Sequence, residues 1–94
     1  MESNRLTIIP VDKTVYRDQG VEFDLNLDSC NIPADVHALQ WYADKGEIEY
    51  KGSKQNEPIT ALPSWALAAI ILWEESYAKN NQSAPGAVNG TITN

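Results

Sequence analysis

The clearest alternation of apolar and polar residues lies at positions 21–28. Apolar side chains occupy the odd positions and polar side chains the even ones: Val21, Phe23, Leu25 and Leu27 against Glu22, Asp24, Asn26 and Asp28. A period of two is typical of a half-buried strand. With the β-rich run at 13–17 and a glycine-ended turn at 18–20, it predicts a hairpin over residues 13–28. The polar row of this hairpin should face water.

A second hairpin is predicted over residues 37–51, with its turn at Lys45-Gly46. Glycine readily adopts the positive φ that a tight hairpin turn needs. Residues 6–10 form a further short β-rich run that Pro10 ends, which suits an edge or first strand. The polar segments 29–35 and 52–58 should be connections.

Two registers are compatible with the second hairpin. In the preferred one Trp41 lies opposite Tyr50, and the apolar residues share one face: Leu39, Trp41, Ala43, Ile48 and Tyr50. A three-residue turn with a bulge at Gly46 would instead place Tyr42 opposite Ile48 and Trp41 beside Glu49. The first register is preferred because it separates the apolar and polar faces cleanly.

A helix is predicted over residues 64–80, with Pro63 at its first turn. At about 100° per residue, one apolar stripe should lie on the sheet. Its members are Ala66, Ala69, Ile70, Trp73 and Tyr77. Positions 65–73 are, however, apolar on every side, and a helix on a sheet buries only one side. The apolar residues outside the stripe are a surplus that loops, the tail or another chain must cover.

Four residues of this surplus are the predicted protein-binding residues: Trp65, Leu67, Ile71 and Leu72. Leu67 and Ile71 fall on one flank of the stripe, and Trp65 and Leu72 on the other. For Trp65, burial in the core and a place in an interface are equally compatible with its position. We expect the helix to contact a second copy of the chain or another protein.

These elements predict a single α+β domain over residues 1–80. It should contain an antiparallel sheet of about four strands in two hairpins, with one C-terminal helix packed on it. Residues 81–94 are rich in Asn, Gly, Ser and Thr and predict an extended C-terminal tail. Within that tail, Asn-Gly at 89–90 between β-formers is compatible with a small hairpin or an added strand. A length of 94 residues fits one domain.

Charge and composition limit the classes of partner that the chain is expected to bind. The net charge is −6, and the 7 Lys and Arg residues form no cluster, so a nucleic-acid partner is not expected. The apolar segment 65–73 is too short to cross a bilayer, so no membrane partner is expected either. The N-terminus has no apolar run of signal-peptide length, which predicts a protein that is not secreted.

Candidate chemistry is sparse. His37 is the only histidine and Cys30 the only cysteine, and neither has neighbours at the spacing of metal ligands or of a nucleophile with its base. Residues 24–35 superficially resemble a calcium loop, but Ser29 stands where that loop needs glycine. We therefore predict no catalytic residue, no metal site and no cofactor, and a protein that is not an enzyme.

Three pieces of the chain, in order, carry a family resemblance: TIIPVDKTVYRDQGVEFDL, DVHALQWYADKGEIEYK and NEPITALPSWALAAIILWEE. Over most of residues 6–77 the chain resembles a family of small bacteriophage tail proteins, some of which are similar to tail-fibre assembly chaperones. The resemblance implies a chaperone that binds a phage tail-fibre protein, forms a homo-oligomer and works in the cytoplasm of the infected bacterium. The alternative that it leaves open is a small structural component of the tail or baseplate, which would remain in the virion.

Overall fold

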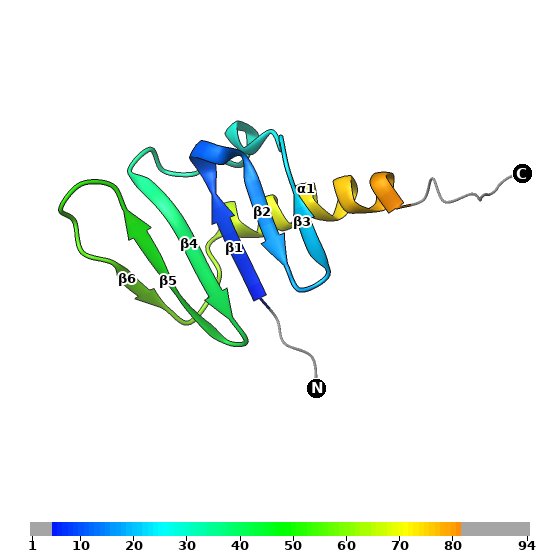
Figure 1. The fold of residues 1–94 in the computed structure, drawn as a ribbon. Coiled ribbons are helices and arrows are strands. Elements are labelled where there is room, and N and C mark those ends of the chain that lie inside the picture. The colour runs from blue at the N-terminus through cyan, green and yellow to red at the C-terminus, as the bar shows by residue number, and fades with distance from the viewer. Residues whose placement is uncertain (1–4, 82–94) are drawn as a thin grey trace, which may run out of the picture.

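The structure is a computed structural model that describes residues 5–81. One antiparallel sheet of six strands carries a single α-helix, α1 (Ser64–Asn81), on one face (Figure 1). The predicted α+β class and the C-terminal helix are thus confirmed. The tail predicted over 81–94 begins at the last residue of α1, and residues 82–94 lie outside the described part of the chain.

The sheet has two strands more than the four or so that the sequence predicts. Its spatial order is β3-β2-β1-β4-β5-β6. The strands and two short 3-10 helices are β1 (Arg5–Ile9), η1 (Pro10–Asp12), β2 (Thr14–Arg17), β3 (Gly20–Glu22), η2 (Leu27–Cys30), β4 (Val36–Tyr42), β5 (Lys45–Tyr50) and β6 (Glu57–Ile59). β1 lies between β2 and β4, so it is the first strand but not an edge strand. Pro10 disturbs no pairing there because it begins η1, after the strand has ended.

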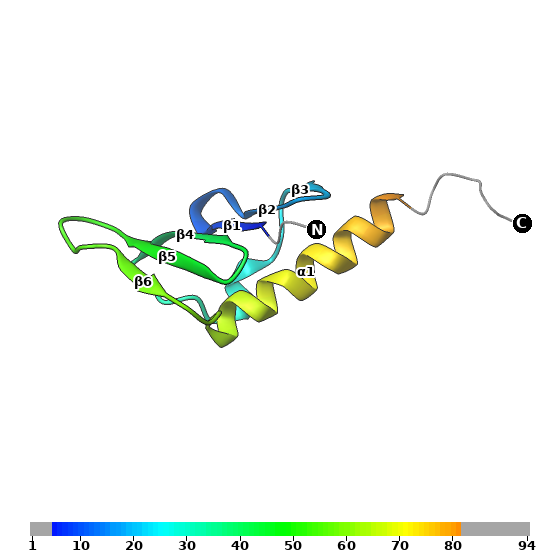
Figure 2. The same cartoon turned by 90° about the horizontal axis from the view of Figure 1, so that it is seen from below.

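The core lies between the sheet and α1 (Figure 2). The sheet contributes Leu6, Ile8, Val15, Leu39, Trp41 and Ile48. From the helix, the predicted stripe is confirmed: Ala66, Ala69 and Trp73 are buried, while Ile70 and Tyr77 are partly buried against the cluster. The two alanines have no bulk beyond Cβ, so the first half of the helix can pack closely on the core.

The second predicted hairpin exists, but its turn and register differ from both expectations. Tyr42 pairs with Lys45, so the turn residues are Ala43 and Asp44. Trp41 lies opposite Gly46, instead of opposite Tyr50 or beside Glu49. Ala43 adopts the left-handed conformation, with φ of 63°, and is exposed instead of joining the apolar face.

Close packing explains why glycine stands at position 46. A Cβ on Gly46 would lie closest to the backbone carbonyl oxygen of Gln40 and would also come within 2.9 Å of a Trp41 ring carbon. Because the Gln40 carbonyl belongs to the backbone and cannot turn away, only a residue without a side chain fits at that point. Glycine is therefore needed for this close approach of β4 and not, as the sequence suggested, for a positive φ.

The strand predicted over 21–28 ends at Glu22, and of its polar row only Glu22 turns inward, while Asp24, Asn26 and Asp28 are exposed as predicted. Glu22 lies opposite Val15, on the core side of the sheet, and is 7% exposed. Asp24 adopts a φ of 57°, which breaks the strand geometry and its alternation. Phe23 is consequently 62% exposed. Two of the apolar residues still reach the core from the following loop and η2: Leu25 and Leu27.

The segment predicted as a polar loop over 52–58 ends in β6, an added edge strand paired with β5. Side-chain contacts hold this segment in place. The Tyr50 hydroxyl donates a hydrogen bond to the Glu57 carboxylate. Lys54 Nζ lies 3.0 Å from Asp35 Oδ2 and 3.9 Å from the centre of the Tyr50 ring. These contacts explain how a segment without an apolar pattern becomes part of the sheet.

Candidate protein-binding surfaces

The predicted protein-binding residues divide into two pairs in the structure. Leu67 and Ile71 are 50% and 54% exposed on the side of α1 turned away from the sheet. Trp65 and Leu72 are partly buried and pack against the core. The structure therefore leaves Leu67 and Ile71 open to a partner and assigns Trp65 and Leu72 in part to the fold.

Helix geometry accounts for this division. Ala66, Ala69 and Trp73 centre the buried side of α1. At about 100° per residue, Leu67 and Ile71 lie more than 100° away from that centre, and no second layer covers them among residues 5–81. Two large aliphatic residues four positions apart form a continuous apolar contact on the helix surface.

A hollow of about 340 Å³ lies beside this surface, between α1 and the loop after β3. Phe23 and Leu72 supply its apolar walls, and Glu75 and Lys79 its polar ones. Sequence reasoning missed Phe23 because strict alternation placed it inside. The one available signal was Asp24, since Asp enters the left-handed region more readily than most residues do.

Polar contacts fix the second half of α1 against β3. The buried Glu22 carboxylate accepts hydrogen bonds from Ser76 Oγ at 2.6 Å and Asn80 Nδ2 at 2.7 Å. Trp73 Nε1 donates to the carbonyl oxygen of Gly20 at 3.2 Å. Because these contacts set the rotation of the helix, they also determine that Leu67 and Ile71 point outward.

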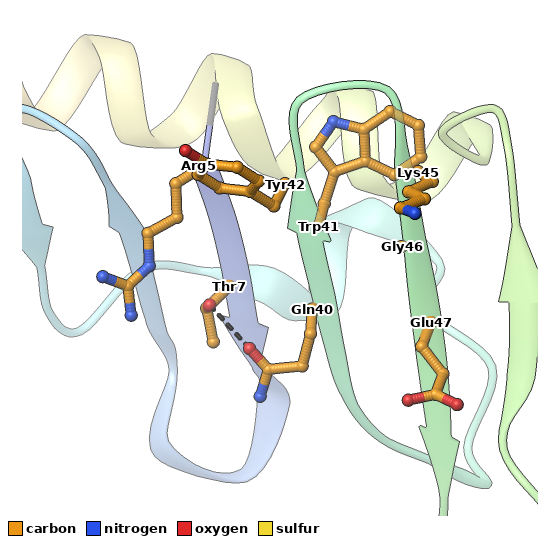
Figure 3. A pocket seen from close by; sticks show the side chains of 8 residues that line it. All are labelled: Arg5, Thr7, Gln40, Trp41, Tyr42, Lys45, Gly46 and Glu47. Atoms are coloured by element: carbon orange, nitrogen blue, oxygen red, sulfur yellow. Dashed lines mark hydrogen bonds between the residues drawn. The ribbon is translucent and has the colours of Figure 1, made fainter. Parts of the chain in front are cut away.

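The opposite face of the sheet carries a second candidate surface, which we call the open-face groove (Figure 3). It encloses about 570 Å³. Its lining residues are Arg5, Thr7, Gln40, Trp41, Tyr42, Lys45, Gly46 and Glu47. Across its floor Thr7 Oγ1 donates to Gln40 Oε1 at 2.8 Å. Nothing in the sequence pattern singled out this groove, because its residues come from three strands that the register brings together.

Arg5, Tyr42 and Lys45 form one row across β1, β4 and β5. Arg5 pairs with Tyr42, and Tyr42 pairs with Lys45, so the three side chains share a face. Figure 3 shows Tyr42 extending toward Arg5. Tyr42 is 61% exposed. An exposed aromatic ring between two cations suits a partner that presents both apolar and acidic groups.

The candidate chemical residues lie apart from both surfaces. Cys30 is buried in η2, and burial raises the pKa of its thiol, which disfavours the reactive thiolate. His37 is exposed on β4. Within residues 5–81, no three His, Cys, Asp or Glu side chains gather in a way that could hold a metal ion. None of the helices in the described part of the chain has the length and apolar character needed to cross a membrane.

Comparisons with protein-family models, with curated proteins and with solved structures found no match. The resemblance to small phage tail proteins therefore stays a prediction.

Proposed function

We propose that this chain is a protein-binding module that acts as a bacteriophage tail-fibre assembly chaperone. The observation that carries the binding role is the half-exposed pair Leu67 and Ile71 on the outward side of α1. The phage context comes from the resemblance over residues 6–77. In this proposal the protein works in the cytoplasm of the infected bacterium and leaves the fibre before the virion is complete.

Exposed aliphatic groups on a rigid helix offer a binding surface at little ordering cost. Full burial of a Leu or Ile side chain contributes roughly 1.5–3 kcal/mol, so covering the exposed halves of Leu67 and Ile71 contributes about 1 kcal/mol each. Phe23 and Leu72 extend this apolar surface at the hollow beside the helix. Association also costs several kcal/mol in lost freedom of motion, so this surface would anchor the contact with a client while further contacts supply the rest of the affinity.

A binding role also agrees with the state of the reactive side chains. The Cys30 thiol is buried with a raised pKa. His37 is exposed on a different element. We therefore propose that the protein acts without catalysis, cofactor or metal, and that its acidic net charge keeps the free chain dispersed before it meets the client.

Co-expression with a tail-fibre protein of the kind that the resemblance implies as client tests the proposal. We expect soluble fibre only when the chain is present, and a complex of defined mass by size-exclusion chromatography with light scattering. The double variant Leu67→Asp/Ile71→Asp should lose the complex. Val11→Asp is the matched control, because Val11 is also an exposed aliphatic residue, at 72%, but lies in η1. It should keep the complex.

Two results would overturn the chaperone role. In one, the fibre is soluble without this chain and the chain elutes alone. In the other, mass spectrometry of purified virions finds the chain in fixed amount, which would favour the small structural component of the tail or baseplate instead.

A further inference from the structure

The outward side of α1 and the open-face groove lie on opposite sides of the sheet, and neither is covered by other residues in the range 5–81. The groove presents the row Arg5–Tyr42–Lys45 on the face that carries no α-helix. The helix presents Leu67 and Ile71 on the side that carries no sheet. One copy of the chain therefore has two open surfaces that cannot reach one another.

The charges of the two surfaces are complementary. Glu74 lies two turns beyond Leu67, and Glu75 one turn beyond Ile71, so the apolar pair is followed by an acidic pair on the outward half of α1. Both glutamates are exposed. Among the described residues, neither glutamate forms an ion pair. The outward side of α1 is thus apolar over its first half and carries Glu74 and Glu75 over the next turn, with the exposed Lys79 one turn beyond Glu75.

The groove repeats this arrangement with the opposite charge. Its row places the exposed ring of Tyr42 between the cations Arg5 and Lys45. Neither cation has an ion-pair partner in the described part of the chain. Two acids lie near this row: Glu47 stands one row further along the groove, and the Asp18 carboxylate accepts a hydrogen bond from the Arg5 backbone N–H at 3.1 Å.

We propose that the open-face groove receives the outward side of α1 from a second copy of this chain. Leu67 and Ile71 of one copy then lie against Tyr42 of the next, and the glutamates that follow meet Arg5 and Lys45. The contact joins two different surfaces, so copies associate head to tail and form a closed ring or an open chain, not a two-fold dimer. The same side of α1 is the client surface proposed above, so a client and a second copy would compete for Leu67 and Ile71. The inference itself does not depend on the identity of any client protein.

Two variants that each block one surface test the proposal. Leu67→Asp/Ile71→Asp blocks the helix side, and Arg5→Glu/Lys45→Glu blocks the groove. By sedimentation velocity, the unmodified chain should form species larger than a dimer as its concentration rises. Each variant alone should remain a monomer. A one-to-one mixture should form a dimer and nothing larger, because the intact helix of one variant enters the intact groove of the other.

Other results overturn the proposal. If the groove-blocked variant still associates with itself, the helices pair with one another and the groove plays no part. If the mixture stays monomeric, the two surfaces are not partners. If the unmodified chain is a monomer up to millimolar concentration, there is no self-association to explain.

Two further measurements keep the test decisive. If circular dichroism shows that an acidic variant is unfolded, Leu67→Gln/Ile71→Gln and Arg5→Gln/Lys45→Gln replace it, and the same mixing result is expected. Adding Glu74→Lys and Glu75→Lys to the groove-blocked variant should restore self-association. The groove-blocked variant keeps its helix surface, so client capture can be measured on it independently.

Discussion

At the scale of single residues, Gly46 shows how a local interpretation can be right about the residue and wrong about the reason. Lys45-Gly46 resembles a hairpin turn in sequence, yet both residues lie in β5 and pair with β4. The Gln40 carbonyl oxygen and the Trp41 ring together exclude a side chain at position 46. Trp41 itself is 8% exposed and belongs to the core, so this contact couples the hairpin to the packing of the whole sheet.

Gly46→Ala should destabilise the protein. The added methyl group overpacks the site against the Gln40 carbonyl oxygen and the Trp41 ring, and overpacking typically costs about 1–3 kcal/mol. Urea denaturation measures the change. In a Trp41→Leu background part of the cost of Gly46→Ala should disappear, because the ring is gone while the Gln40 carbonyl remains. An equal cost in both backgrounds would show that the Trp41 ring contributes nothing to it.

Tyr50 provides a prediction about pH. The hydrogen bond that its hydroxyl donates to Glu57, together with burial and the nearby negative charges, raises the pKa of Tyr50 from 10.0 to about 12. The folded-state pKa is above the unfolded value. The stabilising contribution is therefore fully present below pH 10 and is lost as the pH rises toward 12.

Ultraviolet titration of phenolate formation checks this pKa. One tyrosine should ionise later than the rest in the folded protein, and Tyr50→Phe should remove that late step. Glu57→Gln should lower the pKa of Tyr50, because a neutral amide then replaces the negatively charged carboxylate that accepts the hydrogen bond from the Tyr50 hydroxyl. The prediction fails if the titration shows no late step near pH 12, or if Tyr50→Phe leaves that step in place.

At the scale of elements, the join between β3 and α1 is unusual because a buried carboxylate makes it. Glu22 lies on the core side of the sheet and accepts hydrogen bonds from Ser76 and Asn80. β3 has only three residues, so backbone pairing alone holds it weakly. The contacts to the helix therefore secure an edge strand as well as the rotation of α1.

Glu22→Ala should lower the free energy of unfolding by about 1.5–3 kcal/mol, the range for hydrogen bonds to a charged group. Glu22→Gln should cost less, since both bonds go to one oxygen, Oε1, and the amide oxygen of Gln in that place can still accept them. Urea denaturation gives the energies, and hydrogen exchange of the second half of α1 shows where protection is lost. Unchanged stability and exchange in Glu22→Ala would mean that the carboxylate does not hold the helix.

At the scale of the whole molecule, the layered arrangement leaves one side of α1 and one face of the sheet without cover among residues 5–81. An Asp substitution should consequently cost little stability on the outward side of the helix and much stability on the buried side. Ala69 is fully buried against the sheet, whereas Leu67 is 50% exposed. This contrast tests the orientation of α1 without reference to any partner.

Leu67→Asp should change stability by no more than about 0.5 kcal/mol, as exposed substitutions usually do. Ala69→Asp should unfold the domain or cost several kcal/mol, because an unpaired carboxylate would be buried. Thermal denaturation followed by circular dichroism compares the two. If Leu67→Asp is as damaging as Ala69→Asp, the helix is rotated from the orientation described above.

The sequence by itself determined the elements whose signal is local. The helix over 64–80, its buried stripe and the two hairpins follow from periodicity, and periodicity depends only on neighbouring residues. The excess of apolar residues on α1 was visible in the same way, and it led to Leu67 and Ile71. Trp65 and Leu72 were equally prominent in sequence, and only the packing showed that they belong partly to the core.

Tertiary structure alone decided the register, the inward Glu22, the outward Phe23 and the open-face groove. Each depends on partners that are distant along the chain, such as Ser76 for Glu22 and Tyr42 for Arg5. Shifting a strand by one residue turns every side chain to the other face, so a small change in pairing reverses what is buried. The physical reason is that local propensity selects a strand or a helix, while burial of the common core selects which of its faces points inward.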